Sequence, residues 1–107
     1  MATISTDRKL QTVITTFEVN PGTCQDLLDE LRATCDEFIS KQPGFISAAL
    51  HVNDAQTRIA NYSQWEKRED FMAMLRSDGM RARSRRINEM CKNFEPVMYD
   101  VAYCSGG

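Results

Sequence analysis

The sequence is poor in the residues that hold metals and cofactors. It has one histidine, and its four cysteines show no CxxC spacing. Protein metal sites are built largely from clusters of histidine, cysteine and acidic residues. With one histidine and no paired cysteine spacing, the chain carries no recognisable metal-binding motif. Its five glycines form no GxGxxG loop, which leaves no dinucleotide-binding signature. We interpret the cysteines as reduced and mostly buried.

The chain also lacks a strong net charge and a long apolar run. Thirteen basic and fifteen acidic residues give a net charge of −2, too little to attract nucleic acid or an anionic membrane. No apolar run is long enough to span a bilayer, and Met1–Leu10 has no signal-peptide core. We therefore expect a cytoplasmic protein without nucleic-acid or membrane partners. Its 107 residues suit one domain, over 11–104, after a loosely held N-terminus at 1–10.

Periodic patterns divide the chain into strands and helices. Alternation of apolar and β-branched residues predicts four strands, over residues 11–19, 45–52, 57–65 and 97–104. Helical spacing of apolar residues predicts three helical segments, over residues 23–41, 66–76 and 80–91. Thr23 and Asp26 resemble a capping box at the start of the first helix. Asp78-Gly79 interrupts the second helical unit, and residues 53–56 suit a hairpin loop.

The order of elements indicates the fold. It reads β-α-β-β-α-β, the split arrangement of ferredoxin-like α+β folds with a four-stranded antiparallel sheet. Right-handed crossovers place both helical units on one face of the sheet and leave the other face bare. Neither face of the strand 45–52 has a solvated pattern, so we expect a second copy to cover the bare face in a homodimer.

The strand 57–65 carries an unusual set of polar side chains. Alternation places Ile59, Asn61, Ser63 and Trp65, the only tryptophan, on one face. Polar groups on a buried face are costly unless they have partners or a ligand, so this face is a candidate pocket wall. The alternative is that Trp65 is a core anchor whose indole N–H is satisfied by a carbonyl group.

The chain resembles the antibiotic biosynthesis monooxygenase family of dimeric α+β barrels in two runs, Gln42-Pro43-Gly44-Phe45-Ile46-Ser47-Ala48 and Asn61-Tyr62-Ser63-Gln64-Trp65-Glu66. The likeness in element order covers about residues 12–103. The resemblance implies a homodimer that oxidises an aromatic quinol or an anthrone-type polyketide with O2. It also implies that no flavin, haem or metal cofactor takes part, so the substrate itself must supply the electrons.

The resemblance also implies which residues contact the substrate. Asn61 and Trp65 match the pocket-facing pair of the family, and either N–H could donate to an ionised substrate oxygen. Phe71 stands where the family often has a tyrosine, which removes a hydroxyl that could transfer a proton. Arg85 stands where some relatives place an arginine beside the pocket, and its charge would favour an enolate or phenolate.

Two further candidates come from the residues themselves. Ser63 shares the face of Asn61, so we place it among the substrate-binding residues. His51 is the one side chain whose ordinary pKa suits general-base chemistry near neutrality. It shares a face with Phe45, Ser47 and Ala49 by alternation, and a structural place at the dimer interface is the alternative.

Plainer interpretations stay open for the arginines and for the function. Arg85 belongs to a run of arginines over 81–86, which also suits a solvated helix face. Haem degradation, known among related barrels, needs a histidine on the helices that follow Trp65, and residues 66–91 contain none. A non-catalytic stress-response barrel that binds a small aromatic ligand is the second alternative.

Overall fold

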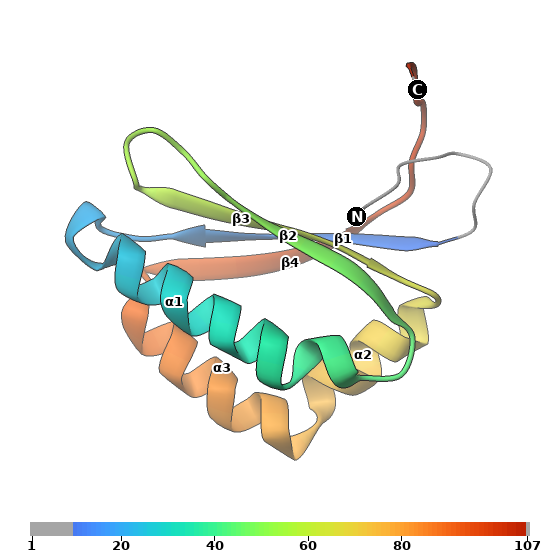
Figure 1. Ribbon diagram of the computed structural model, residues 1–107, viewed down its shortest axis with the longest axis horizontal. Coiled ribbons are helices and arrows are strands. Elements are labelled where there is room, and N and C mark those ends of the chain that lie inside the picture. The colour runs from blue at the N-terminus through green and yellow to red at the C-terminus, as the bar shows by residue number, and fades with distance from the viewer. Residues whose placement is uncertain (1–9, 107) are drawn as a thin grey trace.

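The computed structural model describes residues 10–106 and shows two layers, a four-stranded sheet and a layer of helices (Figure 1). The elements in chain order are β1 (Gln11–Glu18), α1 (Pro21–Glu37), a short 3-10 helix η1 (Ile39–Lys41), β2 (Phe45–Val52), β3 (Arg58–Trp65), α2 (Arg68–Arg76), α3 (Asp78–Met90) and β4 (Asn93–Tyr99). The predicted loosely held N-terminus lies, apart from residue 10, outside the described residues.

The sheet has the topology that the sequence predicts. Its strand order is β2-β3-β1-β4, and every neighbouring pair is antiparallel. The α-helices of the described chain all lie on one face of the sheet and leave its other face without a helix (Figure 1). The ferredoxin-like α+β prediction is therefore confirmed.

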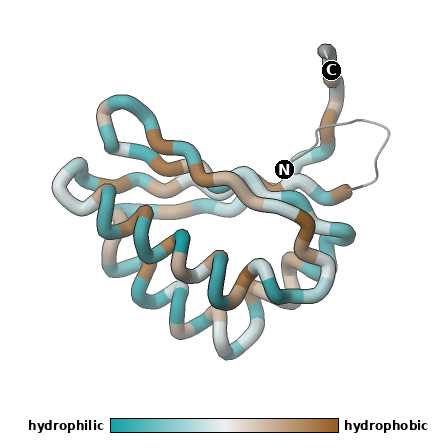
Figure 2. The backbone as a smooth tube through the Cα atoms, viewed as in Figure 1, coloured by the Kyte–Doolittle hydropathy of each residue, from teal (hydrophilic) through white to brown (hydrophobic). Residues whose placement is uncertain are grey.

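The pairing register fixes which side chains meet the helices. Ile59, Ser63 and Trp65 of β3 are buried on the helix side, where β1 contributes Val13 and Phe17. Figure 2 shows hydrophobic and hydrophilic residues alternating along the helices, as expected for helices that cover a sheet with one side only. The core therefore lies between the sheet and the helices, at the face that the sequence pattern singled out.

A bulge near the start of β2 changes one prediction. Phe45 pairs with Trp65 and Ser47 pairs with Gln64, so one extra residue lies in β2 between them. A bulge reverses the alternation for the residues before it. Phe45 therefore packs against the Trp65 ring on the helix side, whereas Ser47 and His51 face the other way. The prediction that Phe45 and His51 share a face is wrong.

The first helix starts earlier than predicted. Asn20 precedes it, and Pro21 occupies its first turn, where the fixed φ of proline favours helix initiation. The Thr23 hydroxyl donates to the Asn20 carbonyl oxygen at 3.2 Å. Thr23 is therefore a residue of the first turn, and the predicted capping box is wrong.

The last strand lies earlier in the chain than predicted. β4 ends at Tyr99, which pairs with Thr12. The strand β1 begins at Gln11, only one residue before Thr12, so it offers almost no further chain for pairing. Residues 100–104 have no neighbouring strand among the described residues, so their alternating pattern does not form a ladder there. Phe94 takes the helix-side position instead and stacks on Phe17 with ring centroids 5.6 Å apart. Pro96 is tolerated because β4 is an edge strand.

Candidate functional site

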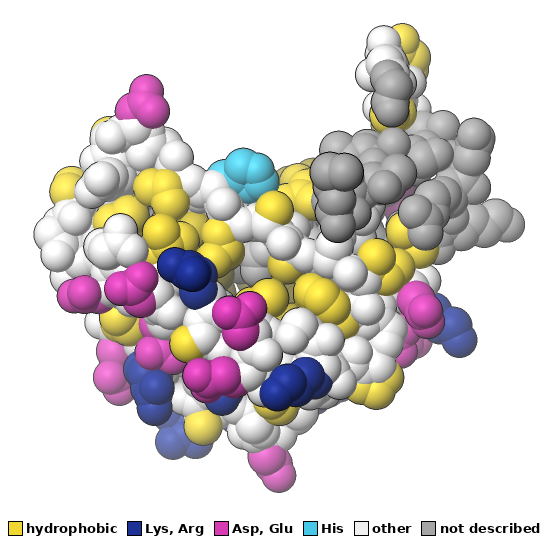
Figure 3. Space-filling view, in the orientation of Figure 1, with side chains coloured by type: hydrophobic (Ala, Val, Ile, Leu, Met, Phe, Trp, Pro, Cys, Tyr) yellow, Lys and Arg dark blue, Asp and Glu magenta, His cyan; other side chains and the backbone are white. Residues whose placement is uncertain are grey.

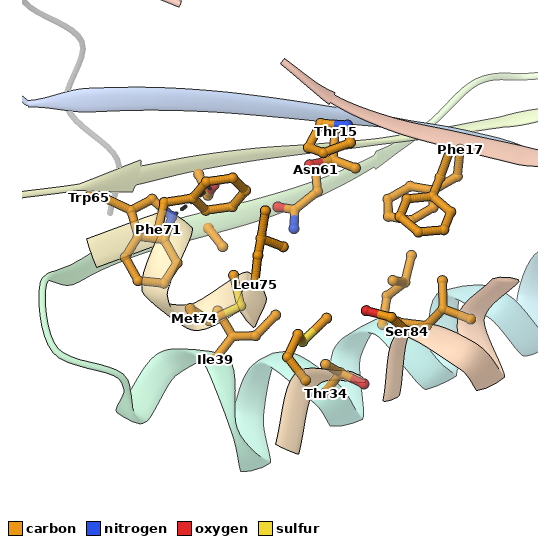
Figure 4. A pocket seen from close by; sticks show the side chains of 17 residues that line it. Thr15, Phe17, Thr34, Ile39, Asn61, Trp65, Phe71, Met74, Leu75 and Ser84 are labelled. Atoms are coloured by element: carbon orange, nitrogen blue, oxygen red, sulfur yellow. Dashed lines mark hydrogen bonds between the residues drawn. The ribbon is translucent and has the colours of Figure 1, made fainter. Parts of the chain in front are cut away.

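An apolar cavity of about 70 Å³ lies between the sheet and the helices (Figure 4). Its wall is formed by side chains from β1, β2, β3, β4 and all three α-helices, with Ile39 of η1. The lining residues are Thr15, Phe17, Leu31, Thr34, Ile39, Ala48, Asn61, Ser63, Trp65, Phe71, Met74, Leu75, Met80, Ser84, Ile87, Phe94 and Pro96. None of them carries a titratable side chain. The cavity therefore offers aromatic and aliphatic surface with a few neutral polar groups.

Asn61 is the polar group that projects from the sheet into this cavity (Figure 4). The alternation of β3 aims it at the helices, between the buried residues Ile59 and Ser63. Its side-chain oxygen Oδ1 is buried and has no hydrogen-bond partner among the described residues. A buried amide oxygen without a partner costs free energy, so a ligand that brings an O–H group would satisfy it.

Trp65 forms the end of the cavity and is fully buried. Its ring meets Phe45 and Phe71 edge to face, with centroids 5.5 and 5.6 Å away. Its indole N–H donates to the Ser63 hydroxyl oxygen at 3.3 Å. The sequence suggested a choice between pocket wall and core anchor, and in the structure Trp65 is both. A substrate oxygen could accept a hydrogen bond from the indole N–H only if it replaced the Ser63 hydroxyl as the acceptor.

Ser63 and Phe71 complete the predicted group around Trp65. The Ser63 hydroxyl accepts from the indole and donates to the Val13 carbonyl oxygen at 3.3 Å, which ties β3 to β1. Phe71, from α2, is buried against the indole and lines the cavity. The structure thus brings four of the six predicted site residues together, namely Asn61, Ser63, Trp65 and Phe71.

The other two predicted residues do not line the cavity. His51 pairs with Ala60 near the end of β2, is exposed, and faces away from the helices. Arg85 is exposed on α3, in an open depression of about 490 Å³ beside the cavity. That depression shares Leu75 and Phe94 with the cavity wall. Arg85 therefore lies at a mouth of the cavity, and His51 lies on the opposite side of the sheet.

The neighbouring arginines connect two helices. Arg83 pairs with Glu37 at 3.2 Å and Arg86 pairs with Glu30 at 3.4 Å, so both join α3 to α1. The Arg83 guanidinium also lies 5.8 Å from the centre of the Phe38 ring. No ion pair with Arg85 occurs among the described residues. The interpretation as a solvated helix face suits Arg81, Arg85 and Arg86, which are exposed.

A second mouth lies between α1 and β2. Hydrophobic side chains are visible there in a hollow below the sheet (Figure 3). This depression of about 410 Å³ is lined by Leu28, Arg32, Cys35, Asp36, Ala48, Leu50 and Asn61. Drug-sized ligands occupy pockets of about 300–1,000 Å³, so the central cavity alone is small for a polycyclic molecule. Such a ligand would have to extend into one of the two mouths.

The cysteines differ in burial and are not chemically prominent. Cys24 is buried, Cys35 and Cys91 are half-buried, and Cys104 is exposed, so the expectation of mostly buried thiols does not hold for Cys104. Burial raises the pKa of the Cys35 thiol, and the charge of Asp36 raises it further. Burial also raises the pKa of Cys91. A raised pKa keeps a thiol protonated and weakly nucleophilic, so neither thiol is a candidate nucleophile.

Sequence reasoning missed Thr34, a polar residue of the cavity wall on α1. It is fully buried, and its hydroxyl oxygen Oγ1 has no hydrogen-bond partner among residues 10–106. The signal was present in the sequence, because Thr34 falls three residues after Leu31 in the apolar stripe of the predicted helix. A hydroxyl in such a stripe is the same anomaly that drew attention to Asn61.

The described residues contain neither a cluster of metal ligands nor a helix suited to a bilayer. No group of three or more histidine, cysteine or acidic residues is positioned to hold a metal ion in that part of the chain. Every helix within residues 10–106 is too short or too polar to span a lipid bilayer.

Comparison with known proteins agrees with this fold. The family model described as antibiotic biosynthesis monooxygenase matches residues 10–86. Tetracenomycin-F1 monooxygenase from Streptomyces glaucescens is 38% identical over 74 residues, which are 69% of this chain and 66% of that protein. The aligned part is thus just under two thirds of that relative.

Solved structures share the fold at lower sequence identity. A monooxygenase from the gene ActVA-Orf6 of Streptomyces coelicolor, in complex with nanaomycin D, gives a TM-score of 0.79 at 24% identity, over 94% of this chain and 95% of that one. A variant of SnoaB, a cofactor-independent oxygenase from Streptomyces nogalater, gives 0.78 at 18% identity, over 89% and 95%. These structures show the shared fold, and the family match over residues 10–86 shows that the chain belongs to the antibiotic biosynthesis monooxygenase family.

Proposed function

We propose that this protein is a cofactor-independent monooxygenase that oxidises an aromatic quinol or an anthrone-type polyketide with O2. The observation that carries the proposal is the Asn61 amide, which projects into an apolar cavity with its oxygen unpartnered among the described residues. The name of the 38% identical relative, a tetracenomycin-F1 monooxygenase, supports the same chemistry. A cytoplasmic location is part of the proposal.

The chemistry needs an electron-rich anion and O2. An ionised phenol or enol passes one electron to O2, and the two radicals then combine to form a carbon–oxygen bond. The resulting peroxide anion takes up a proton, and loss of a carbon-bound hydrogen with cleavage of the O–O bond leaves a carbonyl group and releases water. In sum, an anthrone methylene group and one molecule of O2 become a carbonyl group and one molecule of water. The substrate supplies the electrons, so the balance requires no cofactor.

The described residues would assist this reaction by holding the anion in a dry site. The Asn61 side-chain N–H can donate to the substrate oxygen, while its Oδ1 can accept an O–H from the neutral form. Trp65 and Phe71 give aromatic walls that exclude water. Arg85 lies in the open depression of about 490 Å³ at one mouth of the cavity. Its charge would attract an anionic group on the part of the substrate that extends out of the cavity. No role falls to His51 in this arrangement.

A pH prediction follows from the lining of the cavity. Because no lining residue titrates, the substrate has to lose its proton to water, and the rate is expected to rise with pH up to the substrate's own pKa. Initial rates of O2 uptake would be measured from pH 6 to 9 with two phenolic substrates whose pKa values differ by at least about one unit. We expect the two profiles to be displaced by that difference. Identical midpoints for both substrates would instead reveal a titrating protein group.

O2 uptake with a panel of quinols and anthrones tests the function itself. We expect consumption of O2 with at least one member of the panel in the absence of added flavin, haem or metal. The alternative is a barrel that binds aromatic ligands without turnover. Quenching of Trp65 fluorescence by every ligand that binds, without O2 uptake by any, would favour that alternative.

The homodimer also belongs to the proposal. The sheet face away from the helices carries Ile14, Tyr62, Val97 and Tyr99, and no helix of the described chain lies on it (Figure 1). Tyr99 is 47% exposed, a large value for an aromatic side chain on a sheet. A second copy would remove this surface from water. Analytical ultracentrifugation at micromolar concentration should show twice the chain mass, and a clean monomer would refute the dimer.

A further inference from the structure

Thr34 places a fully buried hydroxyl on the helix wall of the cavity. It lies on α1, its exposed fraction is 0%, and Oγ1 has no hydrogen-bond partner among the described residues. Its side chain lines the central cavity, on the wall that faces the sheet (Figure 4). Valine has nearly the same shape and would fill the position without a buried polar group. Packing therefore does not explain why a hydroxyl stands here.

Asn61 shows the same property on the opposite wall. Its Oδ1 is also buried and also lacks a partner in the described part of the chain, and the Asn61 amide projects from β3 toward the helices (Figure 4). The remaining lining is mostly aliphatic or aromatic. Two such polar atoms on opposite walls of an apolar cavity suit a flat ligand with a polar group at each edge. A single polar group on the ligand could satisfy only one wall.

We propose that Thr34 binds the substrate directly, through a second oxygen at the ring edge opposite the oxygen that Asn61 holds. This inference rests on the proposed function and narrows its substrate class. The preferred ligand is an aromatic ring with oxygen functions at two opposite edges, as in a para-hydroquinone. At the sheet side Asn61 accepts a phenolic O–H, and at the helix side the Thr34 hydroxyl donates to or accepts from the second oxygen.

The test compares two probes that differ by one hydroxyl group. Calorimetric titration without O2 would use 1,4-dihydroxynaphthalene and 1-naphthol against the wild type, Thr34→Val and Thr34→Ser. We expect the wild type to prefer the dihydroxy probe by about 10-fold, the value of one net hydrogen bond. Thr34→Val should lose this preference and bind 1-naphthol as the wild type does. Thr34→Ser keeps the hydroxyl and should retain most of the preference.

Thermal unfolding of the ligand-free variants separates binding from a structural role. Thr34→Val removes an unpartnered buried hydroxyl, so its melting midpoint should equal or exceed that of the wild type. A lower midpoint in Thr34→Val that serine restores would assign the hydroxyl to the fold and overturn the proposal. A preference that survives in Thr34→Val would overturn it as well.

The same experiment distinguishes failure of this inference from failure of the proposed function. If the wild type prefers the dihydroxy probe through Thr34 but consumes no O2 with any quinol, the oxygenase proposal fails and the Thr34 contact stands. If the wild type consumes O2 but shows no preference between the probes, the Thr34 contact fails and the oxygenase stands. If neither probe binds and no member of the quinol and anthrone panel gives O2 uptake, both proposals are overturned.

Discussion

Replacing Asn61 by alanine is expected to lower the rate of O2 uptake by about 100-fold or more, the usual effect of removing a positioned donor to an oxyanion. The amide supplies an N–H group on the sheet wall of the cavity, where the indole N–H already donates to Ser63. The protein itself should remain folded. The Asn61 side-chain oxygen makes no hydrogen bond among the described residues that the fold would lose, and alanine leaves no polar group in its place.

The neighbouring residue provides a matched control for Asn61. Tyr62 lies on the same strand, faces the other side of the sheet, and has a buried hydroxyl with no hydrogen-bond partner among the described residues. Tyr62→Phe therefore removes an oxygen of similar burial that the reaction does not use. We expect its O2 uptake to match the wild type. Equal activities in Asn61→Ala, Tyr62→Phe and the wild type would move the site away from this cavity.

The sequence predicted the face of β3 because local and global constraints agree there. Alternation over eight residues assigned Asn61, Ser63 and Trp65 to one side, and the helices could cover only one side of the sheet. The sequence alone was therefore enough to place Asn61 and Trp65 on the same wall of a pocket. The partner of the indole could not be predicted, because Ser63 and Trp65 meet only in the side-chain conformations that the packed core selects.

Other residues were misplaced where a tertiary constraint outweighed the local pattern. The sequence did not decide whether His51 faces the helices, and it placed Phe45 on the same face as His51. The bulge between Phe45 and Ser47 puts Phe45 and His51 on opposite faces, and the alternating pattern of the sequence gives no sign of a bulge. The end of β4 was placed too late because a strand needs a neighbour, and β1 supplies none beyond Thr12 and Gln11. Thr34 was overlooked because one polar residue in a helix stripe is common, and only the cavity shows that its hydroxyl has no partner among the described residues.

Replacing Trp65 by alanine is expected to lower the free energy of unfolding by about 3–5 kcal/mol, the range for deleting a large buried side chain. Trp65 is fully buried and joins β3 to the start of β2 and to α2 through its contacts with Phe45 and Phe71. Urea unfolding monitored by circular dichroism would measure the change. A loss below about 1 kcal/mol would mean that this end of the core collapses around the gap.

Trp65→Phe separates the two roles that the structure gives this residue. Phenylalanine keeps an aromatic wall but loses the indole N–H, so Ser63 loses a donor and stability should fall by about 1 kcal/mol. The indole N–H donates to the Ser63 hydroxyl and is therefore not available to the substrate. O2 uptake should for this reason fall much less in Trp65→Phe than in Asn61→Ala. A loss of about 100-fold in both variants would instead show that the indole turns from Ser63 to the substrate during the reaction. Ser63→Ala decides between these outcomes, because it leaves the indole N–H without its acceptor. If the substrate uses the indole N–H as a donor, O2 uptake should rise in Ser63→Ala. If the substrate does not use it, O2 uptake should not rise.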